Sequence, residues 1–223
     1  MVYERINQQG ATNMNSFFDL LLNFDLNVFQ WIQNIQNPVL NWIMVAITTI
    51  GNAGIIFIIL GFVLLFTKKH RKEGLTVLIA LIIMLLFNDL FLKEFFARIR
   101  PFDLYESNPE KYALWGTEYT YPDLVYKPSS YSFPSGHTAS AFAAAVAVLL
   151  NNRKTGIPVI IFAFIMGFSR IYVQVHYPTD VIGGIVIGAI CAIIATVIAK
   201  YLFPIIDNAL DKLFSKIKMK KNQ

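Results

Sequence analysis

Apolar runs separated by short polar connections dominate the chain. The runs occupy about residues 40–50, 53–67, 74–92, 137–150, 157–172 and 181–203. A helix needs roughly 20 predominantly apolar residues to cross the hydrocarbon core of a bilayer, and several of these runs approach that length. The pattern therefore predicts an all-α fold, a polytopic membrane helix bundle with about six transmembrane helices.

The number of spans depends on residues 16–50, where apolar positions are mixed with acids and amides. If the first span covers about 26–50, the chain crosses the membrane six times. If 43–67 form one span instead, residues 16–36 form an interfacial amphipathic helix and the chain crosses five times. We adopt six spans as the expectation.

Composition supports a membrane protein. Hydrophobic residues make up 56% of the chain and charged residues only 15%, which is too apolar for an ordinary soluble domain. The expected layout is a polar N-terminal tail (1–15) without the pattern of a secretory signal, a membrane domain (16–204) and a basic tail (205–223).

The basic residues predict the topology. The 19 Lys and Arg exceed the 14 Asp and Glu by five, but they lie between apolar runs, around 68–72, 153–154 and 212–221, so no nucleic-acid partner is expected. By the positive-inside rule these three segments are cytoplasmic. Two runs separate each segment from the next, so all three share one side. The connections 102–133 and 173–180 are then extracytoplasmic, and the chain is a multi-pass protein of the plasma membrane.

A first group of candidate residues follows the third run. Lys93 and Arg100 are seven residues apart, which in an α-helix is within about 20° of two full turns, so they would share one face. Pro101 is expected to end that helix. Two cations on one face can grip an anion such as phosphate. The alternative is that both side chains snorkel to the headgroups.

A second group is Pro134-Ser135-Gly136-His137, directly before an alanine-rich run. If Pro134 opens a helix, the N–H groups of Ser135, Gly136 and His137 form an anion site at its start. The Ser135 hydroxyl would add a donor and His137 a titratable proton. The alternative is an N-cap serine and a histidine that faces the headgroups.

A third group contains Arg170, His176 and Asp180. His176 and Asp180 are four residues apart, so a compact turn would let the carboxylate accept one imidazole N–H and leave the other ring nitrogen as a nucleophile. Arg170 adds another cation. The alternative is that Asp180 caps the last helix and His176 is an interfacial residue without a chemical role.

The three groups converge on the predicted extracytoplasmic face. Cations would hold the oxygens of a phosphate, His176 would attack phosphorus, and His137 would protonate the leaving oxygen. No acidic cluster accompanies these residues, so neither a metal nor another cofactor is expected.

The strings Lys93-x6-Arg100-Pro101, Pro134-Ser135-Gly136-His137 and Ser169-Arg170-x5-His176-x3-Asp180 resemble, in order, the three signature motifs of the type 2 phosphatidic acid phosphatase (PAP2) superfamily. The apolar layout also resembles its six-helix membrane core. Soluble vanadium haloperoxidases share the anion site of this superfamily, but their chains are not membrane bundles, so the hydropathy argues against haloperoxidase chemistry.

The resemblance implies a role for each matching residue. Lys93, Arg100 and Arg170 bind the phosphate with Ser135 and Gly136; His137 acts on the leaving group; His176 is the nucleophile, and Asp180 orients it. Arg98 lies outside the motif and is expected to contact headgroups.

The resemblance further implies a lipid phosphate or diphosphate as substrate, taken from the bilayer. Small chains of this kind resemble bacterial undecaprenyl diphosphate phosphatases, and undecaprenyl diphosphate is the expected substrate because the connection 102–133 offers few additional cations for an anionic headgroup. Phosphatidylglycerophosphate and phosphatidic acid remain alternatives. A non-hydrolytic protein that binds or transports lipid phosphates is an alternative of another class.

Overall fold

The computed structural model describes residues 2–107 and 122–221, with side chains described for 18–52, 54–107 and 122–219. The described residues form helices and connections without a strand. The helices are α1 (Val2–Ile35), α2 (Pro38–Ile50), η1 (Asn52–Gly54), α3 (Ile55–Phe66), η2 (Lys68–His70), α4 (Arg71–Met84), the π-helical η3 (Leu85–Leu92), α5 (Lys93–Phe96), α6 (Pro101–Ser107), α8 (Gly136–Asn151), α9 (Arg153–Tyr172) and α10 (Pro178–Lys221).

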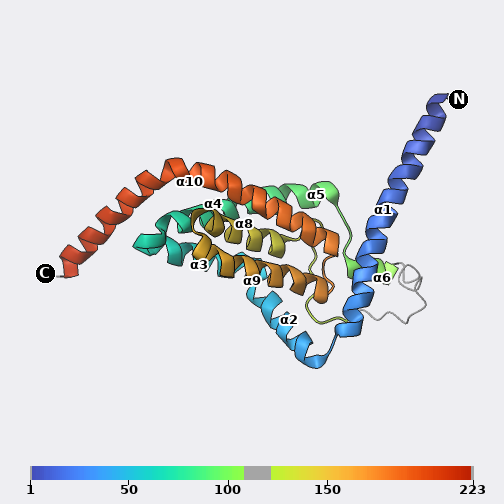
Figure 1. Cartoon of the computed structure of the whole chain (residues 1–223), viewed down its shortest axis with the longest axis horizontal. Helices are drawn as coiled ribbons and strands as arrows, with labels where there is room; N and C mark the ends of the chain where they lie inside the picture. The colour runs from blue at the N-terminus through green and yellow to red at the C-terminus, as the bar shows by residue number, and fades with distance from the viewer. Residues whose placement is uncertain (1, 108–121, 222–223) are drawn as a thin grey trace.

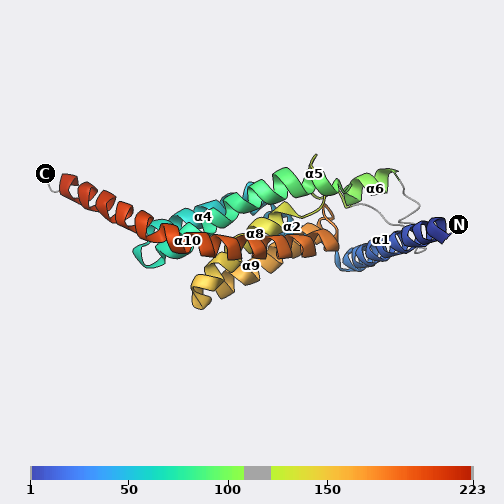
Figure 2. The ribbon, with the colours of Figure 1, turned by 90° about the horizontal axis from the view of Figure 1, so that it is seen from above.

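Helix α8 lies at the centre of the bundle, between α4, α9 and α10, and α3 packs against α4 (Figures 1 and 2). The buried face of α8 consists largely of alanine: Ala139, Ala141, Ala143, Ala144, Ala145 and Ala147. Small side chains let helix backbones approach closely, which increases van der Waals contact where lipid provides no hydrophobic driving force.

Glycines of α10 complete this close contact. A Cβ atom on Gly188 would lie 2.5 Å from the Ala139 carbonyl oxygen of α8, and one on Gly184 would lie 2.8 Å from the Ser135 carbonyl oxygen. Both distances are shorter than any normal carbon–oxygen contact. The start of α8 therefore lies directly against α10 because these two positions carry no side chain.

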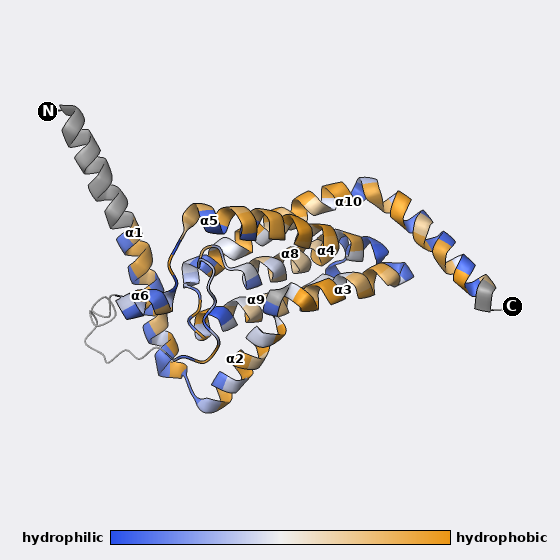
Figure 3. Cartoon of the chain, turned by 180° about the vertical axis from the view of Figure 1, so that it is seen from behind, coloured by the Kyte–Doolittle hydropathy of each residue, from blue (hydrophilic) through white to orange (hydrophobic). Residues whose placement is uncertain are grey.

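Many large apolar side chains are exposed along α3, α4 and α10, and Figure 3 shows that hydrophobic residues predominate in α3, in α4 and in the part of α10 that packs on the bundle. Among the described residues, α4 with its continuation, α9 and α10 are long and apolar enough to cross a membrane, and α2 with α3 adds a fourth span if this pair, bent by 56°, is counted as one. Helix α8 has only 16 residues. The fold class is confirmed, but the count of six spans is not.

The N-terminal part differs from the expected first crossing. Helix α1 ends at Ile35, and Asn37 caps α2 by accepting a hydrogen bond from the Leu40 N–H at 3.0 Å. A continuous span over 26–50 is therefore interrupted at 36–37. Helices α1 and α10 also run across the expected boundaries at 15/16 and 204/205 without a break.

The α3–α4 and α8–α9 connections and the α10 tail lie at one end of the bundle, and the α9–α10 connection lies at the other (Figure 2). At the first end, the buried Arg71 donates to Asp207 at 2.6 Å and to Asp211 at 2.7 Å. These bonds attach the start of α4 to the last part of α10. The three predicted phosphate motifs meet at the second end.

Candidate active site

A cavity of about 350 Å³ is lined by Lys93, Gly136 and His137 together with apolar residues of α3 and α4. The Lys93 Nζ lies 2.7 Å from the Asp89 Oδ1 of η3. Helix α5 ends at Phe96, and Ala97 takes a left-handed conformation with φ 43°. The expectation that Lys93 and Arg100 share one helical face is therefore wrong, because the chain leaves the helix between them.

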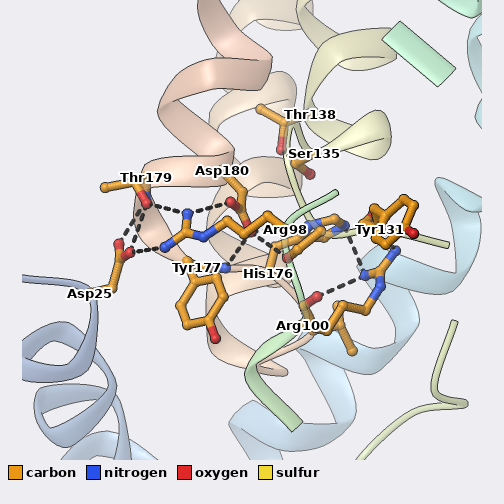
Figure 4. A network of polar contacts seen from close by, with 12 residues as sticks. Asp25, Arg98, Arg100, Tyr131, Ser135, Thr138, His176, Tyr177, Thr179 and Asp180 are labelled. Atoms are coloured by element: carbon orange, nitrogen blue, oxygen red, sulfur yellow. Dashed lines mark hydrogen bonds and ion pairs between the residues drawn. The ribbon is translucent and has the colours of Figure 1, made fainter. Parts of the chain in front are cut away.

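Arg100 follows in the connection to α6, and Pro101 begins α6 instead of ending the preceding helix. The Arg100 side chain is 2% exposed. Its Nε donates to the Ser130 carbonyl at 2.6 Å and its Nη1 to the Val175 carbonyl at 2.8 Å. The guanidinium is thus held in one orientation, with Nη1 also 3.3 Å from the His176 Nε2 (Figure 4).

His176 lies in the short connection between α9 and α10 and is 2% exposed. Since Arg100 Nη1 can only donate, Nε2 is the acceptor and the ring proton belongs on Nδ1. Burial lowers the pKa of His176 well below its usual 6.5, and Arg100, Arg170 and Lys93 lower it further. His176 is therefore a neutral imidazole with a lone pair on Nε2.

Asp180 lies behind this ring, with its Oδ2 3.6 Å from His176 Nδ1. That distance exceeds a normal hydrogen bond, so the expected direct bond is not formed. Oδ2 instead accepts from the Ser132 hydroxyl at 2.5 Å and from the Tyr177 N–H at 2.9 Å. Asp180, in the first turn of α10, thus also caps that helix, and the orienting and capping interpretations are both compatible with its position.

The start of α8 forms only part of the expected anion site. Ser135 is the N-cap residue, but its N–H donates to the Asp180 carbonyl at 3.1 Å, and its hydroxyl accepts from Thr138 at 3.0 Å. Ser135 N–H is therefore not free for an anion. Gly136 and His137 occupy the first two positions of α8, where no earlier turn supplies a carbonyl for their N–H groups.

Two partners from the N-terminal helices were missed by sequence reasoning. His137 Nε2 lies 3.1 Å from the Asn52 Oδ1 of η1. Arg170 Nη1 donates to the Thr48 hydroxyl of α2. The cations Arg170, Lys93 and Arg100 also act electrostatically on His137, so both histidines lie in one positive environment.

Arg98, for which the sequence suggested only a headgroup contact, is held by two buried carboxylates. Its Nη1 donates to Asp180 Oδ1 at 2.6 Å, and its Nη2 donates to Asp25 Oδ2 at 2.7 Å. Asp25, which is fully buried, was also missed. The available signal was an ionisable residue within a largely apolar segment, a kind of residue that is usually paired and functional.

The described residues hold no group of three His, Cys, Asp or Glu side chains arranged to bind a metal ion. Their site contains cations, two imidazoles and two carboxylates, Asp89 beside Lys93 and Asp180 behind His176. Such a set suits binding of an anion followed by transfer of its phosphoryl group to nitrogen.

Comparison with known proteins identifies the family. The sequence profile of the PAP2 superfamily matches residues 73–204. Undecaprenyl-diphosphatase BcrC of Bacillus subtilis is 34% identical over 172 residues, which cover 77% of this chain and 81% of that protein. An undecaprenyl-diphosphatase of Sulfolobus acidocaldarius is 34% identical over 169 residues, 75% of each protein.

A solved structure agrees with the sequence matches. The crystal structure of a transmembrane PAP2 type phosphatidylglycerolphosphate phosphatase from Bacillus subtilis matches with a TM-score of 0.61 and 25% identity, over 82% of this chain and 88% of that one. Fold, site and sequence thus lead to one assignment, and the chain belongs to the PAP2 superfamily.

Proposed function

We propose that this chain removes the terminal phosphate of a lipid diphosphate, with undecaprenyl diphosphate as substrate, through a phosphohistidine formed on His176. The observation that carries the proposal is the buried His176, whose Nε2 lone pair faces Arg100 at 3.3 Å while Asp180 lies behind Nδ1. The substrate follows from two relatives, each 34% identical over about three quarters of this chain, that are named undecaprenyl-diphosphatases.

In the proposed reaction the Nε2 lone pair attacks the terminal phosphorus, and the bond from phosphorus to the bridging oxygen breaks. His137, protonated once the negative charge of the bound diphosphate offsets the surrounding cations, gives that proton to the leaving oxygen. Water then attacks the phosphohistidine, His137 takes up a proton from it, and the phosphorus–nitrogen bond breaks to release inorganic phosphate. The Nδ1 proton stays on His176 throughout, on the side of the ring that faces Asp180.

Arg100 links binding to attack. Its Nη1 donates to the very nitrogen that would attack phosphorus. A phosphate placed in line with Nε2 would accept this N–H on an equatorial oxygen, which frees the lone pair. Lys93 and Arg170 would neutralise the negative charge on the other phosphate oxygens. The Gly136 and His137 N–H groups at the start of α8 would donate hydrogen bonds to the same oxygens.

The cavity has a polar part and an apolar part, which match the phosphate and the hydrocarbon chain of a lipid phosphate. Lys93 with its partner Asp89, His137 and Ser140 supply its polar part, and apolar side chains that include Ile58, Met84 and Leu85 supply its walls. A phosphate at the polar part would leave the first units of an apolar chain against these walls. The cavity therefore supports a lipid substrate that enters from the bilayer.

The distribution of charge supports an extracytoplasmic active site and a cytoplasmic C-terminus. The basic connections and the basic α10 tail lie at the end of the bundle opposite the α9–α10 connection that carries His176 (Figure 2). The positive-inside rule assigns the basic end to the cytoplasm.

The deciding experiment is phosphate release by the purified chain in detergent with EDTA. It compares undecaprenyl diphosphate, phosphatidylglycerophosphate and phosphatidic acid, each with His176→Ala as control. We expect release that resists the chelator, is lost in His176→Ala and is fastest with undecaprenyl diphosphate. If phosphate is released fastest from phosphatidylglycerophosphate, that lipid replaces undecaprenyl diphosphate as the assigned substrate. If no lipid releases phosphate, the chain is a non-hydrolytic binder of lipid phosphates.

A further inference from the structure

Helix α1 contributes a fully buried carboxylate to the environment of the active site. Asp25 is 0% exposed and lies on the same face as the buried Leu26, Phe29 and Ile32. It belongs to a part of the chain outside the region 73–204 that matches the family. A carboxylate that is completely buried is costly unless it is paired, so its partners indicate why it is there.

The partners of Asp25 are at the start of α10. Oδ1 accepts from the Thr179 N–H at 2.9 Å, and Oδ2 accepts from the Thr179 hydroxyl at 2.7 Å. Thr179 is the residue directly before Asp180, and a carboxylate at a helix start is favoured by the helix dipole. Asp25 thus attaches α1 to the turn that carries His176 and Asp180 (Figure 4).

Arg98 connects the two buried carboxylates. Nη2 donates to Asp25 Oδ2 at 2.7 Å, and Nη1 donates to Asp180 Oδ1 at 2.6 Å and to the Thr179 hydroxyl at 2.7 Å. The guanidinium also lies over the Tyr177 ring, 4.0 Å from its centroid. The plane of Arg98 is therefore determined from two sides, by Asp25 and by Asp180.

This arrangement determines how the Asp180 carboxylate is turned. Arg98 holds Oδ1, so Oδ2 is directed toward Ser132 and toward His176 Nδ1, 3.6 Å away. Without Asp25, one amino group of Arg98 would lose its acceptor and the guanidinium would be free to rotate about Asp180. The carboxylate behind the proposed nucleophile would then lose its fixed orientation.

We propose that Asp25 is a positioning residue, which acts through Arg98 on Asp180 and so orients His176 for attack. The inference rests on the proposed function of His176. It gives α1 a role in the reaction: the helix supplies the outer carboxylate of a chain Asp25–Arg98–Asp180–His176.

The first test is Asp25→Asn, with Asp19→Asn as the matched control on the exposed side of the same helix. Asparagine has one acceptor oxygen, so its NH2 group must face either Arg98 or the Thr179 N–H, both of which are donors. We expect kcat for phosphate release to fall by about ten- to hundredfold, as for a small misplacement of a catalytic group, with KM unchanged. An unchanged kcat, or a rise in KM alone, would overturn the inference.

A second pair of variants covers the case in which Asp25→Asn does not fold, since removing one partner of a buried ion pair is strongly destabilising. Thr179→Val keeps the shape of the side chain but removes the hydroxyl between Arg98 and Asp25, and Thr179→Ser keeps that hydroxyl. We expect Thr179→Val to lower kcat at constant KM and Thr179→Ser to retain it. Equal kcat in both would refute the inference.

The two proposals fail in different ways. If wild type releases no phosphate, or His176→Ala still releases it, the proposed function is wrong. If wild type is active and His176→Ala is inactive, but Asp25→Asn or Thr179→Val is as active as wild type, only the positioning role is wrong. Thermal unfolding of each variant in the same detergent separates lost orientation from lost structure.

Discussion

Arg100→Lys keeps a positive charge beside His176 but removes the planar guanidinium group that binds several acceptors at once. The guanidinium donates to the Ser130 carbonyl and hydroxyl, to the Tyr131 carbonyl and to the Val175 carbonyl, at 2.6–3.3 Å. Lysine presents its three donors from a single nitrogen at the end of a flexible stem, whereas the five donors of arginine are fixed in a plane.

The cost follows from the geometry of these bonds. The Ser130 and Val175 carbonyls are bound by different nitrogens of the guanidinium, so one Nζ cannot satisfy both and also reach Tyr131. At least two bonds would be lost in a site that is 2% exposed. A hydrogen bond from a charged donor contributes about 1.5–3 kcal/mol, so the loss is about 3–6 kcal/mol in the free energy of unfolding.

Unfolding of the purified chain in detergent, followed by circular dichroism, measures this loss. Arg153→Lys is the matched control, because Arg153 is exposed at the opposite end of the bundle. We also expect a lower kcat/KM for phosphate release, since a lysine ammonium would not hold an N–H in the fixed position beside His176 Nε2 that Arg100 Nη1 occupies. If Arg100→Lys is as stable and as active as Arg153→Lys, the role assigned to the Arg100 guanidinium group is refuted.

Three further predictions concern His176, Gly188 and Asn52. The pKa of His176 is lowered in the folded protein, so below about pH 6.5 this histidine is protonated in the unfolded chain but not in the native site. The free energy of unfolding should therefore fall as the pH decreases below about 6.5, with a smaller slope in His176→Gln. The acid limb of kcat/KM should also lie below that pH. Gly188→Ala should reduce the yield of folded protein, measured by size-exclusion chromatography, because its Cβ would lie 2.5 Å from the Ala139 carbonyl oxygen, and Gly188→Val should reduce it further; a wild-type yield of either variant would contradict the packing. Asn52→Leu should lower kcat with little effect on unfolding temperature, because it removes the partner of His137 at the edge of the bundle; wild-type kcat would exclude an orienting role.

The residues of the proposed site could be found from sequence because the three motifs keep fixed local spacings. Arg170, His176 and Asp180 lie within one helix–turn–helix segment, and Gly136 and His137 are the first two residues of α8. Lys93 and Arg100 show the limit of such reasoning. Their spacing fits a helical face, but Ala97 adopts φ 43° and the helix ends at Phe96. Helical periodicity describes only residues that remain in the helix.

The number of spans was harder to predict for a related reason. Apolar length is a property of the sequence, whereas a break is decided by caps and packing. Asn37 separates α1 from α2 by capping the second helix, and the bend of 56° between α2 and α3 lies at Gly51–Gly54. Hydropathy alone does not distinguish a bent pair from two crossings.

The sequence by itself determined that this is a helical membrane protein of the PAP2 superfamily, because apolar run length and motif spacing are local properties. Only the tertiary structure decided which side chains support the site. Asp25, Asn52 and Thr48 come from N-terminal helices, and each contacts a residue that is at least 73 positions away along the chain. Such partners depend on how α1 and α2 pack against the bundle. The same packing places Arg98 between two buried carboxylates, Asp25 and Asp180, a position that the sequence did not predict.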